Sequence, residues 1–274
     1  YKKAFNRHTP LFAEYVSKLV SGDKTVKVNA NAIFPHDVLK GVIGSYNRAI
    51  LDKTATDHIV AQWDALPNYV GDASIMPIVD VSGSMSCPAG KNTNVTCMDV
   101  SISLGLYLAD KNKGVFKDTF LTFSSKPQLV TLKGNIVDKV AQMSKRDWDM
   151  STNLHSAFEA ILGYAVKGNV SANDMPKYIL VMSDMQFNQC ARYDDTAMQM
   201  IERKFADAGY TVPQIVFWNL NSSDNVPVKA DKSGAALVSG FSPPPKQPTQ
   251  FLRLTALLLV RSLHRPSVSP RSTR

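Results

Sequence analysis

Short apolar runs alternate with segments of helical pattern between Gly71 and Phe241, and this alternation constrains the fold more than any other feature of the chain. Strands separated by helices form parallel sheets, because each helix returns the chain across a face of the sheet. The turn at 124–127 is too short for such a crossover, so it predicts a hairpin and one antiparallel strand. The predicted strands are Ile75–Asp80, Lys117–Phe123, Gln128–Leu132, Tyr178–Ser183, Gln214–Leu220 and Ala235–Phe241.

Amphipathic segments of helical length lie between most of these runs. We therefore expect an α/β fold with a doubly wound, mostly parallel six-stranded sheet, one antiparallel edge strand and helices on both faces. The predicted helices of this part are Met98–Leu108, Ile136–Met143, Asn153–Val166 and Ala197–Ala208.

A small helical region precedes the sheet. Apolar residues recur at helical spacing at about 10–20, 35–46 and 56–66. Three short helices bury little surface alone, so we expect residues 1–70 to be a fragment of a larger helical domain. Residues 71–241 then form the predicted α/β domain.

The C-terminal segment 242–274 differs from the rest in composition. It is rich in Pro, Arg and Ser, and the leucine-rich stretch Phe251–Leu263 fits one helix followed by disorder. The abrupt change after Phe241 fits a frameshift equally well. Six of its residues are Lys or Arg and none is Asp or Glu, so the rest of the chain carries only +2 of the formal +8. We interpret this tail as solvated, with a nucleic-acid arm as the alternative.

The strand Ile75–Val79 ends at Asp80 and leads into a loop rich in oxygen atoms. Ser82 and Ser84 follow at alternate positions, so the loop has the pattern Asp-x-Ser-x-Ser, with Gly83 between the serines. One carboxylate and two hydroxyls on a tight turn are hard oxygen ligands of the kind that Mg²⁺ prefers. The alternative is a polar turn that caps a helix.

Two further polar clusters are expected at the same edge of the sheet. Thr152 precedes a predicted helix, and Asp184 follows a predicted strand. Ligands of doubly wound sheets bind beyond the carboxyl ends of the strands. A helix cap at Thr152 and a simple turn at Asp184 are the alternatives. The sequence thus predicts one Mg²⁺ or Mn²⁺ site with the ligands Asp80, Ser82, Ser84, Thr152 and Asp184.

This pattern resembles the metal-ion-dependent adhesion site of the von Willebrand factor type A (vWA) domain. The family motif joins Asp-x-Ser-x-Ser to a distant Thr and a more distant Asp, and the order of elements over residues 72–241 is similar as well. The resemblance implies that Ser82 and Ser84 bind the metal directly, whereas Asp80, Thr152 and Asp184 act directly or through water. It also implies that an acidic side chain of a protein partner completes the metal shell.

A helical region followed by a vWA-like domain is also similar to uncharacterised plant and viral vWA proteins and, more distantly, to Ro-type (TROVE) RNA-binding proteins. We therefore expect a monomeric, non-enzymatic protein-binding domain that depends on a divalent cation, with RNA binding of the Ro type as the alternative.

A third alternative is a Mg²⁺-dependent phosphatase. The haloacid-dehalogenase motif requires a second acid where this chain has Ser82. The sequence contains no Gly-x-Gly-x-x-Gly pattern, phosphate loop or Ser-His-Asp arrangement. We predict no catalytic residue and no organic cofactor.

The sequence also predicts a cytoplasmic setting. No apolar run approaches the roughly 18 residues that a membrane span requires, and no secretory apolar region follows Tyr1. Three cysteines without a Cys-x-x-Cys pair indicate a reducing compartment. We interpret Cys87 and Cys97, which flank a loop next to the predicted site, as inert thiols, and a redox switch is the alternative.

Overall fold

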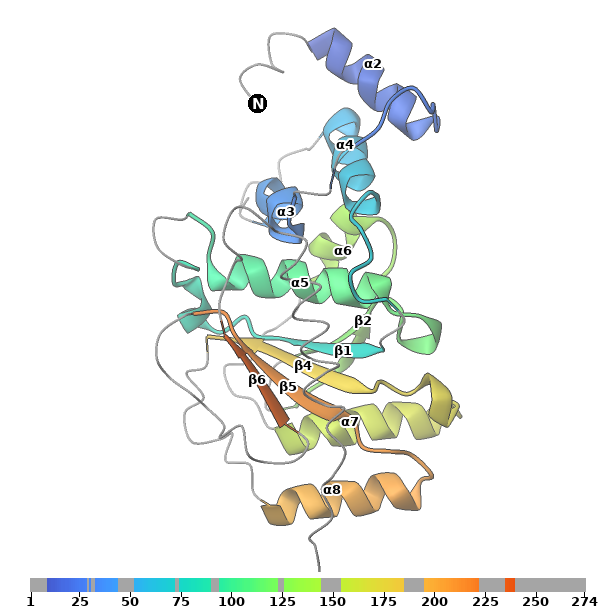
Figure 1. Ribbon diagram of the computed structural model, residues 1–274, viewed down its shortest axis with the longest axis vertical. Coiled ribbons are helices and arrows are strands. Elements are labelled where there is room, and N and C mark those ends of the chain that lie inside the picture. The colour runs from blue at the N-terminus through green and yellow to red at the C-terminus, as the bar shows by residue number, and fades with distance from the viewer. Residues whose placement is uncertain are drawn as a thin grey trace, which may run out of the picture.

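A six-stranded sheet forms the middle of the protein (Figure 1), in the order β3-β2-β1-β4-β5-β6. Neighbouring strands are parallel except for β2 and β3. The mostly parallel sheet with an antiparallel edge strand is therefore confirmed. The strands are β1 (Ile75–Val79), β2 (Thr119–Thr122), β3 (Leu129–Thr131), β4 (Tyr178–Ser183), β5 (Gln214–Asn219) and β6 (Ala235–Ser239).

The computed structural model describes residues 9–28, 30, 33–43, 52–71, 74–89, 94–122, 126–143, 154–184, 195–221 and 235–239. Thr152 and the segment 242–274, on which two of the sequence predictions depend, lie outside these residues.

Residues of the central strands alternate between two apolar cores. In β1, Met76 and Ile78 belong to one core, whereas Ile75 and Val79 belong to the other. The same alternation continues in β4 and β5, because successive side chains of a strand point to opposite faces of the sheet. Both faces are apolar, so helices must cover both.

The helices do cover both faces (Figure 1). One face packs against α5 (Cys97–Lys111), with α6 (Ile136–Met143) next to it, and the other packs against α7 (Leu154–Lys167) and α8 (Asp195–Asp207). This arrangement confirms the mixed α/β architecture with helices on both faces. Because helices cover both faces of the sheet, polar loops lie at the ends of the strands.

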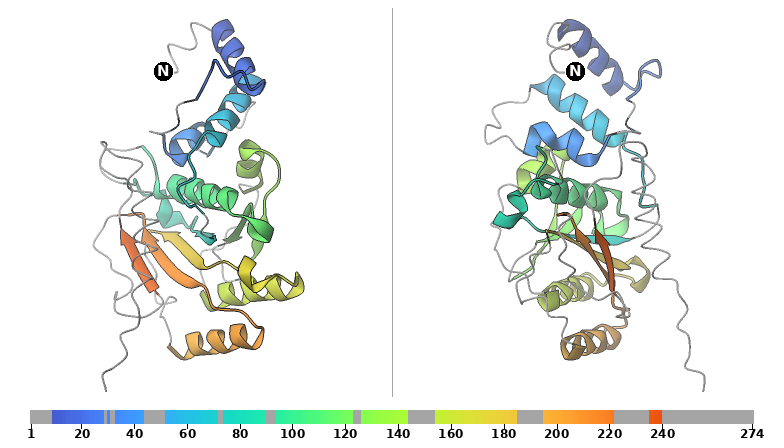
Figure 2. Two further views of the ribbon diagram at one scale, coloured as in Figure 1. Left: turned by 45° about the vertical axis from the view of Figure 1, so that its right-hand side comes forward. Right: turned by 60° about the vertical axis from the view of Figure 1, so that its left-hand side comes forward.

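Three N-terminal helices extend the α5 layer outward. They are α2 (Thr9–Val20), α3 (Pro35–Ile43) and α4 (Lys53–Asp64), and Figure 2 shows α2 at the outer end of this stack. Apolar residues of α3 and α4, among them Leu39 and Trp63, lie in the same core as α5. The domain boundary near residue 70 stays a prediction.

Tyr107 of α5 attaches the N-terminal helices to the sheet domain. Its ring lies edge-on to Trp63 with centroids 6.3 Å apart. Its hydroxyl donates to the Pro67 carbonyl at 2.5 Å and accepts from the Tyr69 N–H at 2.9 Å. Burial raises the pKa of this phenol to about 12. The segment after α4 is therefore held against α5 by a neutral, fully bonded tyrosine.

The helix α5 approaches β1 closely at Gly105. A Cβ atom at this position would overlap Cγ2 of Val79 and would contact the Met182 side chain at 3.6 Å. Val79 is the last residue of β1 and directly precedes Asp80. The small residue in α5 therefore sets how closely the helix packs over the end of this strand.

One predicted strand begins later than expected. Lys117 and Asp118 were predicted to be extended, but β2 begins at Thr119 because Asp118 has the left-handed φ of 57°. Asp tolerates this conformation better than most residues. The backbone of Asp118 donates to the Ala109 carbonyl at 2.7 Å and accepts from Leu132 at 2.8 Å.

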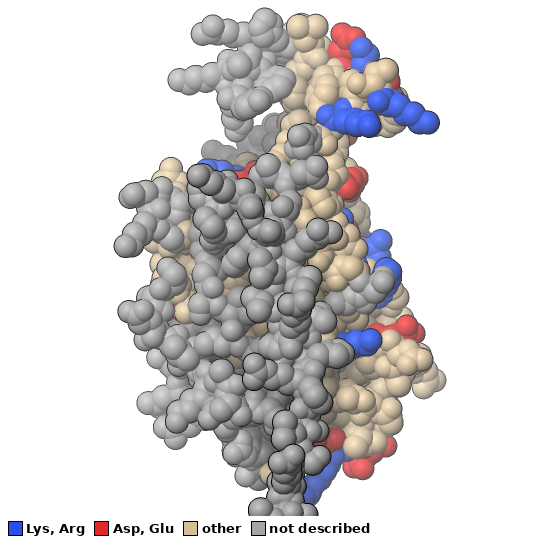
Figure 3. All heavy atoms as spheres, viewed as in Figure 1, with Lys and Arg blue, Asp and Glu red and all other residues tan. Residues whose placement is uncertain are grey.

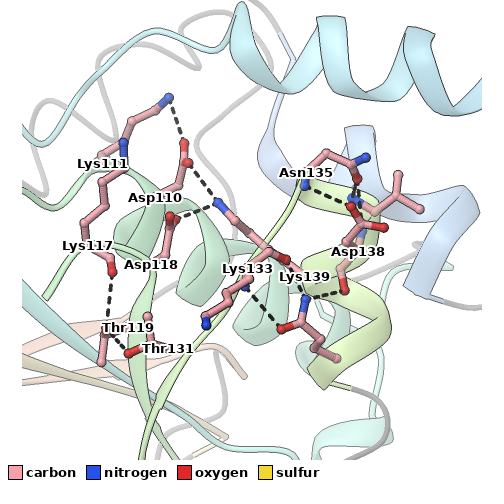
Figure 4. Close-up of polar contacts among 12 residues, drawn as sticks. Asp110, Lys111, Lys117, Asp118, Thr119, Thr131, Lys133, Asn135, Asp138 and Lys139 are labelled. Atoms are coloured by element: carbon pink, nitrogen blue, oxygen red, sulfur yellow. Dashed lines mark hydrogen bonds and ion pairs between the residues drawn. The ribbon is translucent and has the colours of Figure 1, made fainter.

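The Asp118 side chain belongs to a charge cluster between α5, β2 and α6 (Figure 4). The ammonium of Lys139, which is buried, lies 2.6 Å from Asp118 Oδ1 and 3.4 Å from Asp110 Oδ1. Lys111 lies 3.1 Å from the other oxygen of Asp110. Burial alone would raise the pKa of Asp110, but Lys111 and Lys139 outweigh burial and lower it.

None of the helices in the described part of the chain has the length and apolar character needed to cross a membrane.

Candidate functional site

Asp80 and Asp184 follow two neighbouring parallel strands. The register of β1 and β4 places Val79 next to Met182. The N–H of Asp80 donates to the Met182 carbonyl at 3.2 Å, so the hydrogen bonding between β1 and β4 continues to Asp80. The loops after the two strands therefore begin side by side at the carboxyl edge of the sheet.

The carboxylate of Asp80 is buried and fixed by hydrogen bonds. Its Oδ1 accepts from the backbone N–H of Ser82 at 2.8 Å, and its Oδ2 accepts from the Ser183 hydroxyl at 2.5 Å. Asp80 is only 2% exposed. Burial raises the pKa of Asp80, the bonds from Ser183 and Ser82 lower it, and the nearby charge of Asp184 adds to the rise. The net direction is upward.

Ser82 and Ser84 lie together on the turn that follows. The short 3₁₀ helix η2 (Gly83–Ser86) begins after Ser82, and the two hydroxyl oxygens lie 3.0 Å apart. Both residues are partly exposed. Adjacent ligands of an octahedral Mg²⁺ at about 2.1 Å are also roughly 3.0 Å apart. The spacing therefore suits a shared cation as well as a hydrogen bond.

Asp184 connects the second loop to the first. The residue is 2% exposed, and its N–H donates to Sδ of Met85, which is fully buried within η2, at 3.1 Å. The charge of Asp184 contributes to the raised pKa of Asp80, so it acts on the first carboxylate from the second loop. The structure thus brings together Asp80, Ser82, Ser84 and Asp184, the predicted ligands that lie in the described part of the chain.

The donor set of this site is unusual for zinc or copper. No group of three His, Cys, Asp or Glu side chains that could hold a metal ion is found among the described residues. The predicted set contains two carboxylates, and its other members are hydroxyls. Hydroxyl and carboxylate oxygens with water suit Mg²⁺ or Mn²⁺ rather than zinc or copper.

A family model for a domain of unknown function, DUF7788, matches residues 74–247. The chain belongs to the DUF7788 family. The match begins one residue before β1 and includes every strand of the sheet. All five predicted ligands of this DUF7788 domain lie within the matched range.

One relative of this chain is a viral protein. An uncharacterized protein of Acanthamoeba polyphaga mimivirus is 34% identical over 246 residues, which are 86% of this chain and 40% of that protein. The chain therefore spans less than half the length of this relative. The relative agrees with the predicted similarity to uncharacterised viral proteins.

A solved structure has a similar fold. The crystal structure of the Ro (RSR) protein of Deinococcus radiodurans matches with a TM-score of 0.52 at 14% identity, over 90% of this chain and 48% of that chain. At this identity the likeness concerns the fold. Because it extends over 90% of the chain, it includes part of the N-terminal helical region as well as the sheet domain.

Two residues of the DUF7788 domain support the site without having been predicted as metal ligands. Ser183 donates to Asp80, and Ser101 of α5 donates to the Met182 carbonyl at 3.3 Å, the same carbonyl that accepts from Asp80 N–H. Ser183 precedes Asp184 at the end of β4, so the sequence places it at the site, but its bond to Asp80 appears only in the folded protein. Ser101 lies far away in sequence, and no local pattern indicates its contact.

Proposed function

We propose that this chain is a non-enzymatic, divalent-cation-dependent protein-binding domain. Mg²⁺ or Mn²⁺ would be held by Asp80, Ser82, Ser84, Thr152 and Asp184. The observation that carries the proposal is the pair of buried aspartates at neighbouring strand ends, with two partly exposed serines on the adjoining turn whose hydroxyl oxygens lie 3.0 Å apart.

Electrostatics support a cation at this place. Two like charges close together in a poorly solvated site repel each other, and a divalent cation would turn this repulsion into attraction. Asp80 carries the raised pKa expected of such a site. The hydroxyls of Ser82 and Ser84 are neutral ligands, so the two aspartates balance the charge of the cation and do not exceed it. A carboxylate of a protein partner is a hard oxygen ligand of the same kind and would complete the metal shell.

The metal can be tested by calorimetric titration with Mn²⁺. We expect binding by the natural chain and at least about tenfold weaker binding after Asp184→Asn, Ser84→Ala or Thr152→Ala, since each change removes one ligand. Asp174→Asn is the matched control, because Asp174 is exposed in the short helix η4 (Ala172–Asp174), which precedes β4. Equal binding by the natural chain and Asp80→Ala would refute the site.

The partner can be tested by pull-down with and without a chelator. A protein retained with Mg²⁺ and released by chelator is expected, and the same release should follow Asp184→Asn. Turnover of a generic phosphate ester by the natural chain, lost in Asp184→Asn, would instead favour the phosphatase alternative.

A second candidate function is RNA binding of the Ro type. The fold likeness to the Ro protein over 90% of the chain supports it. Figure 3 shows basic side chains at the end of α2 and in the turn after it, where Lys18, Lys24 and Lys27 are exposed. Acidic residues adjoin them, and Lys18 is paired with Glu14 at 2.7 Å. This mixed surface is a weaker basis for a proposal than the strand-end carboxylates.

Filter binding to small RNAs at several salt concentrations tests this candidate. RNA binding through lysines weakens steeply with salt, and Lys24→Glu with Lys27→Glu should reduce it further. Lys113→Glu, next to η3 (Gly114–Phe116) in the sheet domain, is the control. Absence of salt-dependent binding would rule the candidate out.

A further inference from the structure

Two cysteines face each other beside the proposed metal site. Sγ of Cys87 and Sγ of Cys97 are 3.4 Å apart. Both are free thiols, and they were interpreted from the sequence as inert. They lie ten positions apart in the chain, and nothing in their local sequence indicates that the side chains meet.

The backbone holds the two cysteines opposite each other. Pro88 and Thr96 form an antiparallel bridge, and the N–H of Cys97 donates to the Cys87 carbonyl at 3.0 Å. Opposed residues of an antiparallel pair have Cα atoms about 4.5–5.5 Å apart, within the range that disulfides require. Closing the bond would bring the sulfur atoms to about 2.05 Å, so they would approach by little more than 1 Å.

We propose that Cys87 and Cys97 form a reversible disulfide by exchange with a small-molecule disulfide. The Cys87 thiolate attacks the small disulfide and releases one small thiol, leaving a mixed disulfide on Cys87. The Cys97 sulfur then attacks Cys87 Sγ, the mixed disulfide breaks, and the second small thiol leaves. The two protons of the cysteines end on the two small thiols, and the protein is oxidised by two electrons.

The surroundings of the two thiols explain why Cys87 reacts first and Cys97 second. Cys87 is partly exposed and its sulfur accepts from the Asn221 amide at 3.7 Å, so an outside disulfide can reach it. Cys97 is fully buried. A fully buried thiol is a poor target for an outside reagent. It remains in contact with Cys87 and can resolve the mixed disulfide.

The disulfide would join two elements of the site. Cys87 directly follows η2, which carries Ser84, and Cys97 is the first residue of α5. The bond would therefore fix the serine turn to the helix whose Ser101 supports the end of β4. We infer that oxidation tightens cation binding severalfold by holding this turn in place, an effect that rests on the function proposed above.

The bond itself is tested by mass spectrometry on the full chain carrying Cys190→Ser, which leaves only this pair. After treatment with oxidised glutathione, denaturation and alkylation, we expect loss of both alkylation sites without a glutathione adduct. The Tm of the oxidised protein should be roughly 5 °C higher than that of the reduced protein, and reduction should restore the lower value. Cys97→Ala should retain glutathione on Cys87, and Cys87→Ser should retain an alkylatable Cys97. Two free thiols, or an adduct on Cys87 with Cys97 unreacted, would overturn the proposal.

Titration of the oxidised and reduced forms with Mn²⁺ tests the coupling separately. Tighter binding by the oxidised form is expected, and a closed disulfide with unchanged Mn²⁺ affinity would overturn the coupling. Absence of Mn²⁺ binding by both forms would overturn the metal site and the coupling with it, while the mass measurement would still establish the disulfide.

Discussion

The hydroxyl of Ser183, the last residue of β4, donates a hydrogen bond of 2.5 Å to Oδ2 of Asp80, which follows the neighbouring strand β1. Both residues are only 2% exposed. The bond therefore fixes the orientation of the Asp80 carboxylate from the strand that also carries Asp184. Residues that orient metal ligands in this way commonly change metal affinity as strongly as a weak ligand does.

Ser183→Ala is expected to weaken Mn²⁺ binding by about 10-fold or more, because Asp80 loses the donor that holds it in place. Ser86→Ala is the control, since Ser86 is an exposed serine of the same turn. Calorimetric titration of the two variants compares them directly. Equal affinities would show that Ser183 does not position the site.

Gly105→Ala should destabilise the protein by about 1–3 kcal/mol, because the added methyl group overlaps Val79 at the end of β1. Gly163→Ala in α7 has no atom within 4 Å of the new Cβ and should be neutral or stabilising by up to about 1 kcal/mol. Urea unfolding of both variants gives the two free energies. A destabilisation shared by both would point to the glycine backbone rather than to the α5–β1 contact.

The sheet and most of its helices could be predicted from the sequence, because apolar runs such as Ile75–Val79 are short, strongly patterned and bounded by polar turns. The juxtaposition of Asp80 and Asp184 followed from a general rule about parallel strands. The bond from Ser183 to Asp80 and the Cys87–Cys97 contact could not be predicted in this way, since each depends on side chains that meet only in the folded protein. The left-handed φ of Asp118 is a single backbone conformation that the apolar pattern does not reveal.

Lys139→Met should destabilise the protein by about 2–4 kcal/mol, because it leaves Asp110 and Asp118 as partly buried carboxylates without their shared ammonium. Lys133→Met, at an exposed position just before α6, should change the free energy of unfolding by no more than about 0.5 kcal/mol. Chemical denaturation measures both. Equal, small effects would mean that water replaces the ammonium at no cost.

The natural chain should also lose stability in acid through Asp110. Its folded pKa lies below the ordinary value of 3.8, so its stabilisation is complete above that pH and disappears as pH falls through the folded pKa. Lys139→Met raises the folded pKa and should reduce this loss. Unfolding free energies measured at several acidic pH values test the difference, and parallel curves for the natural chain and the variant would contradict it.

The contact between α2 and α4 should weaken in mild acid because of His58. Its ring lies between Phe12 and Tyr15, with centroids 5.0 and 6.5 Å away, and its buried Nδ1 has no hydrogen-bond partner among the described residues. Burial lowers the pKa of His58 below the ordinary 6.5, so the folded state favours the neutral ring. The resulting stabilisation is complete above pH 6.5 and is lost as pH falls from there through the folded pKa.

Hydrogen exchange of the α2 amides, corrected for intrinsic rates and measured between about pH 5 and pH 8, should show protection that decreases on acidification. His58→Leu should flatten this dependence, because leucine fits an apolar contact and does not titrate. His155→Gln is the control, since His155 lies on α7 beside Glu159 and remote from α2. The same pH dependence of amide protection in the natural chain and in His58→Leu would contradict this prediction. It would show that another group causes the response and that the contact between α2 and α4 does not depend on the charge of His58.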